Sequence, residues 1–197
     1  MSIAAIIIAS AHRRELLKGK VLPSVIAEGF DEVVVVGEYE SGLGYRYFHV
    51  PDMTKTTIDA LVKRDVGTLA TTADIICYLS DDHAFEPFDP EWRAMLDEVY
   101  QMEPRGIGVP VRVARNGTED VILNMGLDAS DSNAPYCAGH AGFFPRSLIQ
   151  YMPWTSMPHH RNWDLINTRL QLAAGALLVG LPFVTIRDLE PETKPWQ

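Results

Sequence analysis

Apolar and polar positions follow one another along this chain in blocks that predict strands and helices in turn. Short apolar runs rich in β-branched residues favour strands buried on both faces. Between these runs, apolar residues recur at helical spacing. Strands and helices that alternate in this way are typical of an α/β protein with a parallel sheet. We expect strands over residues 3–9, 32–36, 45–50, 75–79, 107–113, 121–125 and 177–186, and helices over 13–28, 58–67, 89–99, 145–151 and 162–174.

Local signals refine the expected helices and sheet. Gly67 is expected to end the second helix, whereas Asp89 before Pro90 has the residue types of a helix start. The pair Asn116-Gly117 predicts a β-hairpin. Because a hairpin adds antiparallel strands to the parallel ones, we expect a mixed sheet.

The composition is that of a folded globular chain. Of the 197 residues, 47% are hydrophobic and 22% are charged, which fits one domain with a sizeable core. We expect that domain to span residues 1–187, followed by a C-terminal tail over 188–197. The formal net charge of -9 argues against broad, salt-driven binding to nucleic acid or to anionic membranes.

The sequence also favours a cytoplasmic location. Cys77 and Cys137 are the two cysteines, too few for a disulfide framework or a zinc cluster. The apolar start of the chain lacks the basic residues of a secretory leader. No apolar run approaches the length of a membrane span.

The strand expected over residues 75–79 carries the strongest chemical signal, because Asp81, Asp82 and His83 follow it closely. In open α/β sheets, ligands bind beside the carboxyl ends of the strands. Two adjacent carboxylates repel each other unless a cation or a donor lies between them. Oxygen ligands of this kind suit Mg²⁺ or Mn²⁺ shared with substrate phosphates. The alternative is a loop in which an aspartate caps a helix or closes a turn.

Several segments stand in an order that resembles one known family. They are residues 10–16, 22–25 and 33–36, Arg64 to Gly67, Leu79 to Asp82, Ala138-Gly139 with Phe144 to Arg146, and Trp163-Asp164 with Arg169, Leu170 and Gly175. In this order and spacing the chain resembles the GT-A glycosyltransferases, in particular those of family 2, over roughly residues 3 to 182.

The resemblance implies a GT-A fold, an α/β architecture with a mixed, mostly parallel sheet flanked by helices. It implies a metal-dependent, hexosyltransferase-like enzyme that moves a sugar from a nucleoside-diphosphate sugar to a hydroxyl acceptor. A single displacement with inversion is expected, and retention stays open because the outcome depends on which face the acceptor occupies. The expected cofactor is Mn²⁺ or Mg²⁺. The acceptor stays open among a saccharide, a lipid, a protein and a modified DNA base, and so does a homo-oligomer or a partner protein.

The resemblance also assigns roles to individual residues. Asp164 would be the general base, and Asp82 and His160 would bind the metal. The acceptor side would include Gly139, His140 and Trp163. The expected nucleotide-sugar-binding residues are Ser10, His12, Arg13, Glu38, Arg64, Asp65, Ser80 and Asp81.

This sequence departs from the family pattern at four positions. Ser80 replaces the first acid of the metal motif, so metal binding would fall mainly on Asp82. Glu38 stands where the family usually has an aspartate for the nucleotide base, and Asp65 replaces an asparagine. Trp163 replaces the first acid of the pair that contains the general base.

The sequence leaves a second interpretation of Asp164 open. An acid in the first turn of a helix stabilises the helix dipole without any catalytic role. The apolar stripe of that helix, Trp163, Ile166 and Leu170, is expected to face inward, with Asp164 on the other side.

Other candidate residues have a structural interpretation as well. Trp154 is expected to pack in the core rather than to stack on a sugar. Arg13 and Arg64 suit nearby acids as well as phosphate. Three histidines could be surface residues or a third metal ligand: His140, His159 and His160.

Two further classes of function remain open. A nucleotidyltransferase acting on sugar phosphates needs a glycine-rich loop after the first strand, and residues 9–14 contain no glycine. A non-catalytic subunit that binds nucleotide sugars fits the departures at Ser80 and Trp163.

Overall fold

The computed structural model describes residues 1–53, 57–113, 119–123, 125–127, 135–137, 141–150, 153–156 and 163–189. The strands are β1 (Ile3–Ala9), β2 (Glu32–Gly37), β3 (Arg46–His49), β4 (Ile75–Ser80), β5 (His83–Phe85), β6 (Gly106–Val113), β7 (Glu119–Leu123), β8 (Met125–Leu127), β9 (Pro135–Cys137), β10 (Ala141–Pro145) and β11 (Leu177–Asp188). The helical segments are η1 (Ala11–Arg13), α1 (Arg14–Leu16), η2 (Leu17–Val21), α2 (Leu22–Ala27), α3 (Thr57–Ala70), α4 (Trp92–Met102), α5 (Arg146–Ile149), η3 (Trp154–Ser156) and α6 (Trp163–Ala173).

A mixed sheet forms the centre of the fold. Its order is β3-β2-β1-β4-β10-β6-β11-β5, with β7 paired to β6, and a separate pair joins β8 to β9. Strands β3, β2, β1 and β4 are mutually parallel, whereas β10 runs antiparallel to β4. The predicted mixed sheet is confirmed, and the carboxyl ends of the parallel strands meet at one edge.

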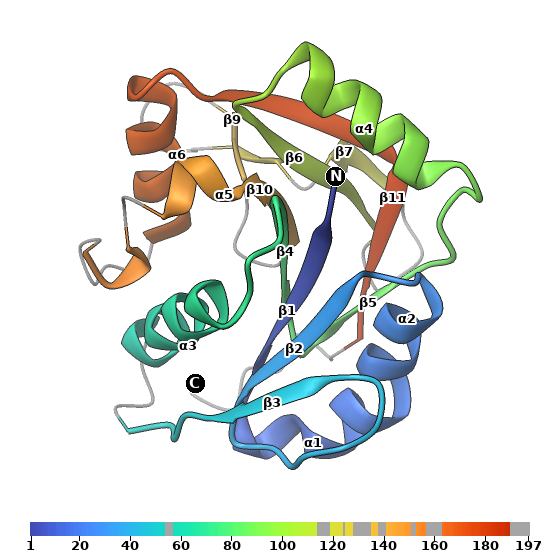
Figure 1. Ribbon diagram of the computed structural model, residues 1–197, viewed down its shortest axis with the longest axis vertical. Coiled ribbons are helices and arrows are strands. Elements are labelled where there is room, and N and C mark those ends of the chain that lie inside the picture. The colour runs from blue at the N-terminus through green and yellow to red at the C-terminus, as the bar shows by residue number, and fades with distance from the viewer. Residues whose placement is uncertain are drawn as a thin grey trace.

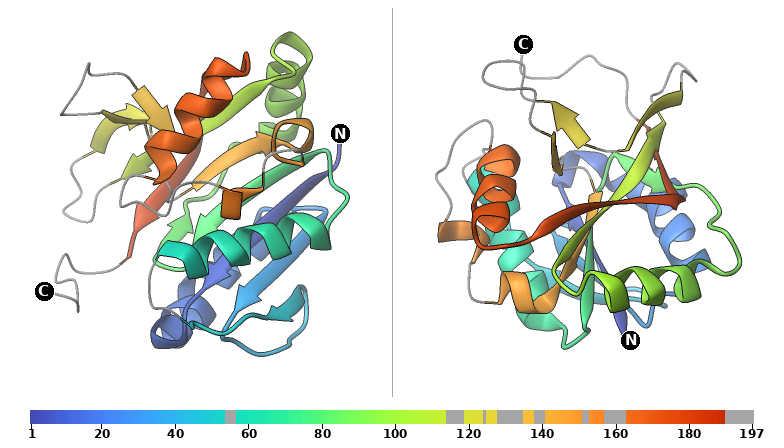
Figure 2. Two further views of the ribbon diagram at one scale, coloured as in Figure 1. Left: turned by 90° about the vertical axis from the view of Figure 1, so that its left-hand side faces the viewer. Right: turned by 90° about the horizontal axis from the view of Figure 1, so that it is seen from above.

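Helices cover both faces of this sheet (Figure 1). Along β1 the side chains alternate between two cores, because successive residues of a strand point to opposite faces. Ile3 and Ile7 pack in one core with residues of α2 and α4, and Ile6 and Ile8 pack in the other with residues of α3 and α5. Figure 2 shows α3 and α6 together in front of one face of the sheet.

Helix α3 corrects the prediction that Gly67 ends the second helix. The helix continues through Gly67 to Ala70. A Cβ atom at position 67 would lie 2.4 Å from Cγ2 of Ile6, which is closer than atoms can pack. Gly67 therefore lets α3 approach the sheet closely, and its lower helix propensity is outweighed by tertiary packing.

The remaining helix starts follow the sequence with small shifts. The region 13–28 is helical, with a π-helical segment, η2, at Gly19, and Pro23 lies in the first turn of α2, where a missing N–H is tolerated. Helix α4 begins at Trp92 rather than at Asp89. Asp89 forms the preceding turn, in which its carbonyl oxygen accepts a hydrogen bond from the Trp92 N–H at 2.9 Å.

The inward face of α6 differs from the predicted stripe. Leu170 is 43% exposed, and among the described side chains of α6 the buried ones are Asn167, Thr168 and Gln171. The polar face has a physical reason, because the Thr168 hydroxyl accepts a hydrogen bond from the Cys137 N–H of β9 at 3.2 Å. A buried backbone donor requires such a partner. The side chain of Trp163 lies outside the described residues.

The C-terminal half contains the predicted hairpin strands. Strands β6 and β7 pair antiparallel, and the intervening Asn116-Gly117 lies outside the described residues. Strand β11 pairs parallel with β6 and shifts register between Leu181 and Thr185, beside Pro182. Within the described part of the chain, no helix has the length and apolar character needed to cross a membrane.

Candidate functional site

The carboxyl ends of β1, β2 and β4 bring three predicted site residues into one layer. Ile8 lies opposite Ser80, and Ala9 lies opposite Gly37 in the sheet register. The next residues along each strand are therefore neighbours at the sheet edge: Ser10, Glu38 and Asp81.

Gly37 allows the strand ends to approach one another. Its φ is +145°, and a Cβ atom there would lie 2.0 Å from the carbonyl oxygen of Ala9. Any side chain at position 37 would push β2 away from β1, so the glycine fixes where Ser10 and Glu38 lie.

Asp81 is the most deeply buried acid of this edge, with its side chain 2% exposed. Its Oδ2 atom accepts hydrogen bonds from the Ser10 N–H at 2.6 Å and the Ser10 hydroxyl at 2.5 Å. Burial raises the pKa of Asp81; Arg13 and Ser10 act against the shift. In this structure Ser10 contacts Asp81, and its contact with a ligand stays a prediction.

Arg13 lies between the two adjacent acids. Its Nη1 atom is 2.9 Å from Oδ1 of Asp81, and its Nη2 atom is 3.1 Å from Oδ2 of Asp82. A planar guanidinium can hold two carboxylates in this way because its donors form a rigid fork. The guanidinium is the cation that the paired carboxylates require.

His83 connects Asp82 to the last strand. Its Nδ1 atom lies 2.6 Å from Oδ1 of Asp82, and its Nε2 atom lies 2.5 Å from Oδ1 of Asp188. Burial acts to lower the pKa of His83, but the hydrogen bonds with Asp188 and Asp82 outweigh it, so the pKa is raised. The sequence pointed to His83 beside the acids; the role of Asp188 was missed because it lies far along the chain.

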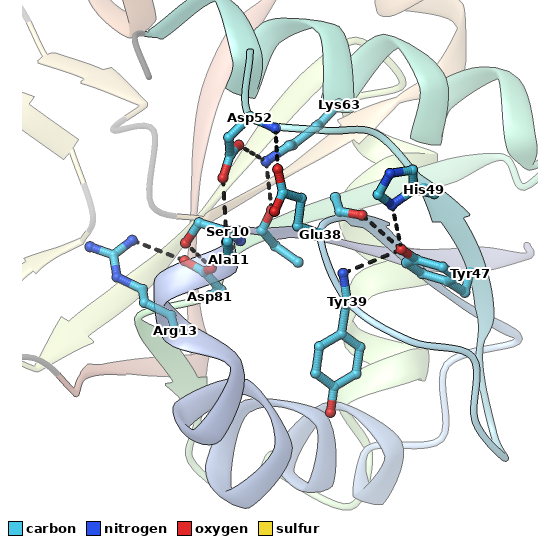
Figure 3. Close-up of polar contacts among 12 residues, drawn as sticks. Ser10, Ala11, Arg13, Glu38, Tyr39, Tyr47, His49, Asp52, Lys63 and Asp81 are labelled. Atoms are coloured by element: carbon cyan, nitrogen blue, oxygen red, sulfur yellow. Dashed lines mark hydrogen bonds and ion pairs between the residues drawn. The ribbon is translucent and has the colours of Figure 1, made fainter. Parts of the chain in front are cut away.

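A second charged group, missed from the sequence, lies at the end of β1 (Figure 3). The buried ammonium of Lys63 donates to the carbonyl oxygen of Ala9 at 2.6 Å and pairs with Asp52. Asp52 also accepts a hydrogen bond from the Ala11 N–H at 3.3 Å. Its own N–H donates to Oε1 of Glu38 at 2.8 Å. Lys63 thus connects α3 and the segment after β3 to the strand edge.

Tyr47 contacts the backbone on both sides of Glu38. The Tyr47 hydroxyl donates to the carbonyl oxygen of Gly37 at 3.1 Å and lies 2.9 Å from Nδ1 of His49. The Tyr39 N–H donates to the same hydroxyl at 3.3 Å (Figure 3). These contacts give the segment after β2 a defined path next to the predicted base-binding acid.

Arg64 lies away from this edge, in the core. Its guanidinium carbon is 4.7 Å from the ring centre of Tyr78 and 4.9 Å from that of Trp154, a cation–π arrangement. Asp65 accepts hydrogen bonds from the backbone N–H groups of Trp154 and Thr155 at 2.7 and 3.0 Å. The expected packing of Trp154 in the core is confirmed, since its side chain is buried.

Asp164 lies half-buried in the first turn of α6. Burial lowers the pKa of the Arg64 guanidinium, and the charge of Asp164 nearby acts against that shift. His12 is exposed on η1, and Ser80 is half-buried at the end of β4. The other predicted site residues lie outside the described residues: Gly139, His140, His159 and His160.

The donor set at the strand edge suits a divalent cation bound jointly with a ligand. No three His, Cys, Asp or Glu side chains in the described ranges gather as a complete metal site. Mg²⁺ and similar ions are commonly held by one or two carboxylates together with substrate phosphates. Asp81 and Asp82 already hold a cationic group, the Arg13 guanidinium, so their oxygen atoms fit this role.

Comparisons with known proteins identify the fold. No family model and no curated protein matches the sequence. A crystal structure of GalNAc-T7 with UDP, GalNAc and Mn²⁺ is similar at a TM-score of 0.68 and 13% identity, over 98% of this chain and 45% of that one. A crystal structure of residues 1–349 of TarS from S. aureus is similar at a TM-score of 0.65 and 11% identity, over 94% of this chain and 60% of that one.

Both solved structures are GT-A glycosyltransferases, and this chain has the GT-A fold. The expected fold is confirmed. The chain spans about half the length of the solved chains that it matches. At this level of identity, the likeness establishes the architecture, and function has to be argued from the site.

Proposed function

We propose that this chain is a glycosyltransferase that binds a nucleoside-diphosphate sugar at the carboxyl edge of β1, β2 and β4. The observation that carries the proposal is the charged cluster at this edge of a GT-A fold, in which Arg13, Asp81 and Asp82 lie together. Ligands of open α/β sheets bind at this edge. The similarity to a structure that contains UDP and Mn²⁺ supports the same class of donor.

The proposed donor would lie along the layer that Glu38, Ser10 and Asp82 define. Glu38 and the aromatic residues after β2 would contact the nucleotide base. Arg13 would interact with the diphosphate, since guanidinium groups match phosphate oxygens. Glu38 is held by the Asp52 N–H, so its carboxylate is oriented before a ligand arrives.

A bound Mn²⁺ or Mg²⁺ would neutralise the charge that develops on the leaving diphosphate. In this proposal Asp82 is the principal protein ligand, because its side chain is 22% exposed, whereas that of Asp81 is 2% exposed and accepts two hydrogen bonds from Ser10. Asp81 then has a positioning role, because it holds Arg13 and the turn after β1 in place.

Asp164 is the proposed general base. The acceptor hydroxyl oxygen would form a bond to C1 of the sugar while its proton passes to the Asp164 carboxylate. The bond from C1 to the diphosphate oxygen breaks in the same step, and a single displacement of this kind inverts the configuration at C1. Asp164 is half-buried rather than enclosed, which leaves part of the side chain accessible to an acceptor.

Hydrolysis of nucleotide sugars tests this proposal. The protein is incubated with Mn²⁺ and a panel of UDP-, GDP-, ADP- and CMP-linked sugars, and release of free sugar is measured. We expect hydrolysis of one donor class. A parallel incubation with nucleoside triphosphates and sugar phosphates measures pyrophosphate. Pyrophosphate release without donor hydrolysis would identify a nucleotidyltransferase, and binding without either reaction would identify a non-catalytic subunit.

A further inference from the structure

The contacts of Arg13 raise a question about the order in which the site assembles. The guanidinium lies where a cation bound to Asp82 would be attracted, and it contacts Asp81 and Asp82 at 2.9 and 3.1 Å. Two cationic groups so close together repel each other. A divalent ion and Arg13 therefore compete for the same carboxylate charge.

The two acids hold Arg13 unequally. Asp81 is 2% exposed, and its Oδ2 atom is already fixed by the N–H and the hydroxyl of Ser10. Asp82 is 22% exposed, and its carboxylate contacts Arg13 and His83 among other groups. Asp82 is thus the acid that solvent ions can reach, and its contact with Arg13 is the one that can be exchanged.

Arg13 itself is placed to change partners. It ends η1, a short 3-10 segment directly after β1, and its side chain is 17% exposed. The long side chain can rotate while Asp81 keeps one of its nitrogen atoms. A phosphate beside Asp82 would offer the released Nη2 atom a new charge-assisted hydrogen bond.

We propose that Arg13 is an exchangeable counter-ion of this site, which neutralises Asp82 in the free protein and moves to the donor diphosphate when a divalent cation takes its place. This inference rests on the proposed function for the identity of the diphosphate. Its first half, the competition between Arg13 and the metal, concerns this chain alone. The exchange makes metal and nucleotide binding mutually dependent. The diphosphate draws Arg13 away from Asp82, which removes its repulsion of the metal, and the metal releases Arg13 to bind the diphosphate.

Titration of Mn²⁺ alone, followed by calorimetry, tests the competition. In Arg13→Ala, Asp82 loses its resident cation, so we expect Mn²⁺ to bind about tenfold or more tightly than in the wild type. The matched control is Arg14→Ala. Arg14 is the next residue, is exposed, and pairs with Glu40 at 3.4 Å. The control loses the same net charge, and its Mn²⁺ affinity should stay within about twofold of the wild type.

A second variant covers the case in which Arg13→Ala does not fold. Arg13→Lys keeps the charge but lacks the fork that contacts two carboxylates. We expect it to bind Mn²⁺ more tightly than the wild type and less tightly than Arg13→Ala. Thermal melting establishes which variants are folded. Equal or weaker Mn²⁺ binding in a folded Arg13 variant, or an equal rise in Arg14→Ala, would overturn the inference.

A nucleotide arm separates this inference from the proposed function. UDP and GDP are titrated into each protein at saturating Mn²⁺. We expect the nucleoside diphosphate that the wild type binds to bind Arg13→Ala about tenfold more weakly, since a diphosphate contact is lost. If the wild type binds neither, the proposed donor class fails, and the Mn²⁺ contrast still decides whether Arg13 and a metal compete.

Discussion

Two arginines that the sequence proposed as nucleotide-sugar ligands lie in regions of opposite character. Arg13 lies at the sheet edge, where its guanidinium joins Asp81 and Asp82 and is partly exposed to solvent. Arg64 is 3% exposed, and its guanidinium packs against the rings of Tyr78 and Trp154, which also contact each other. Arg13 contacts Asp82, a carboxylate that solvent ions can reach, whereas Arg64 is buried beside two aromatic rings.

The difference indicates that burial, more than residue type, distinguishes ligand-binding residues from residues that stabilise this fold. A buried guanidinium that packs against the rings of Tyr78 and Trp154 contributes to the core. A guanidinium at a strand edge can exchange partners. The strand-edge region should therefore govern ligand affinity, and the Arg64 region should govern stability.

Asp164→Asn gives the largest expected effect, because Asp164 is the proposed general base. It lies near Arg64, so the variant also tests whether Asp164 belongs to the supporting region. Replacing Asp164 with Asn should lower kcat by about 10²–10⁴-fold, the usual cost of losing a general base, with donor affinity nearly unchanged. Steady-state kinetics and donor titration measure both quantities. Near-normal turnover would remove Asp164 from the chemistry. A large fall in Tm together with lost turnover would assign it to the supporting region instead.

Trp154→Ala tests the supporting role of the Arg64 region. The indole packs against Tyr78, donates a hydrogen bond to its hydroxyl at 3.1 Å and covers Arg64. Its removal should lower the free energy of unfolding by about 3–5 kcal/mol. Urea denaturation measures this change. The control Leu69→Ala, at a position 82% exposed, should change it by less than about 0.5 kcal/mol. Equal effects in the two variants would contradict the assignment.

Lys63→Met tests a residue that links the two regions, since Lys63 is buried on α3 and contacts the strand edge. The variant leaves Asp52 without its ammonium partner. We expect the free energy of unfolding to fall by about 1.5–3 kcal/mol, as for other hydrogen bonds to charged groups. Lys18→Met, at an exposed position, is the matched control in urea denaturation. A stability equal to that of the wild type would show that the pair is dispensable.

Glu38→Ala has the smallest expected effect. Among the described residues, its carboxylate accepts one hydrogen bond, from the Asp52 N–H, so stability should fall by about 1 kcal/mol or less. The relative affinities for different nucleoside diphosphates should change by several-fold, on the order of 1 kcal/mol. Competition between UDP and GDP at saturating Mn²⁺ measures the ratio. An unchanged ratio would make Glu38 a loop acid that only holds the segment after β3.

The sequence predicted the parts of the fold that depend on local pattern. The apolar runs of β1, β2 and β4 are buried on both faces, so their positions could be read directly, and the acids that follow β4 marked the sheet edge. The contacts that organise this edge could not be read in the same way. Arg13 and Asp81 are 68 residues apart, and nothing in either segment identifies the other.

The wrong predictions have a common physical origin in packing between distant elements. Gly67 predicts a helix end, but the close approach of Ile6 requires a glycine inside the helix. The face of α6 reads as apolar at Leu170, but the backbone of β9 needs a polar partner at Thr168. Local propensity is a weak prior where tertiary contacts decide.

Calorimetric titration of UDP and GDP into the wild type and Asp82→Asn, each with saturating Mn²⁺, tests the central claim most directly. The claim is that the acids after β4 form the metal-linked part of a donor site. We expect the wild type to bind one of these nucleoside diphosphates and Asp82→Asn, shown to be folded by thermal melting, to bind it at least about tenfold more weakly. Equal affinity in the two proteins would contradict the account.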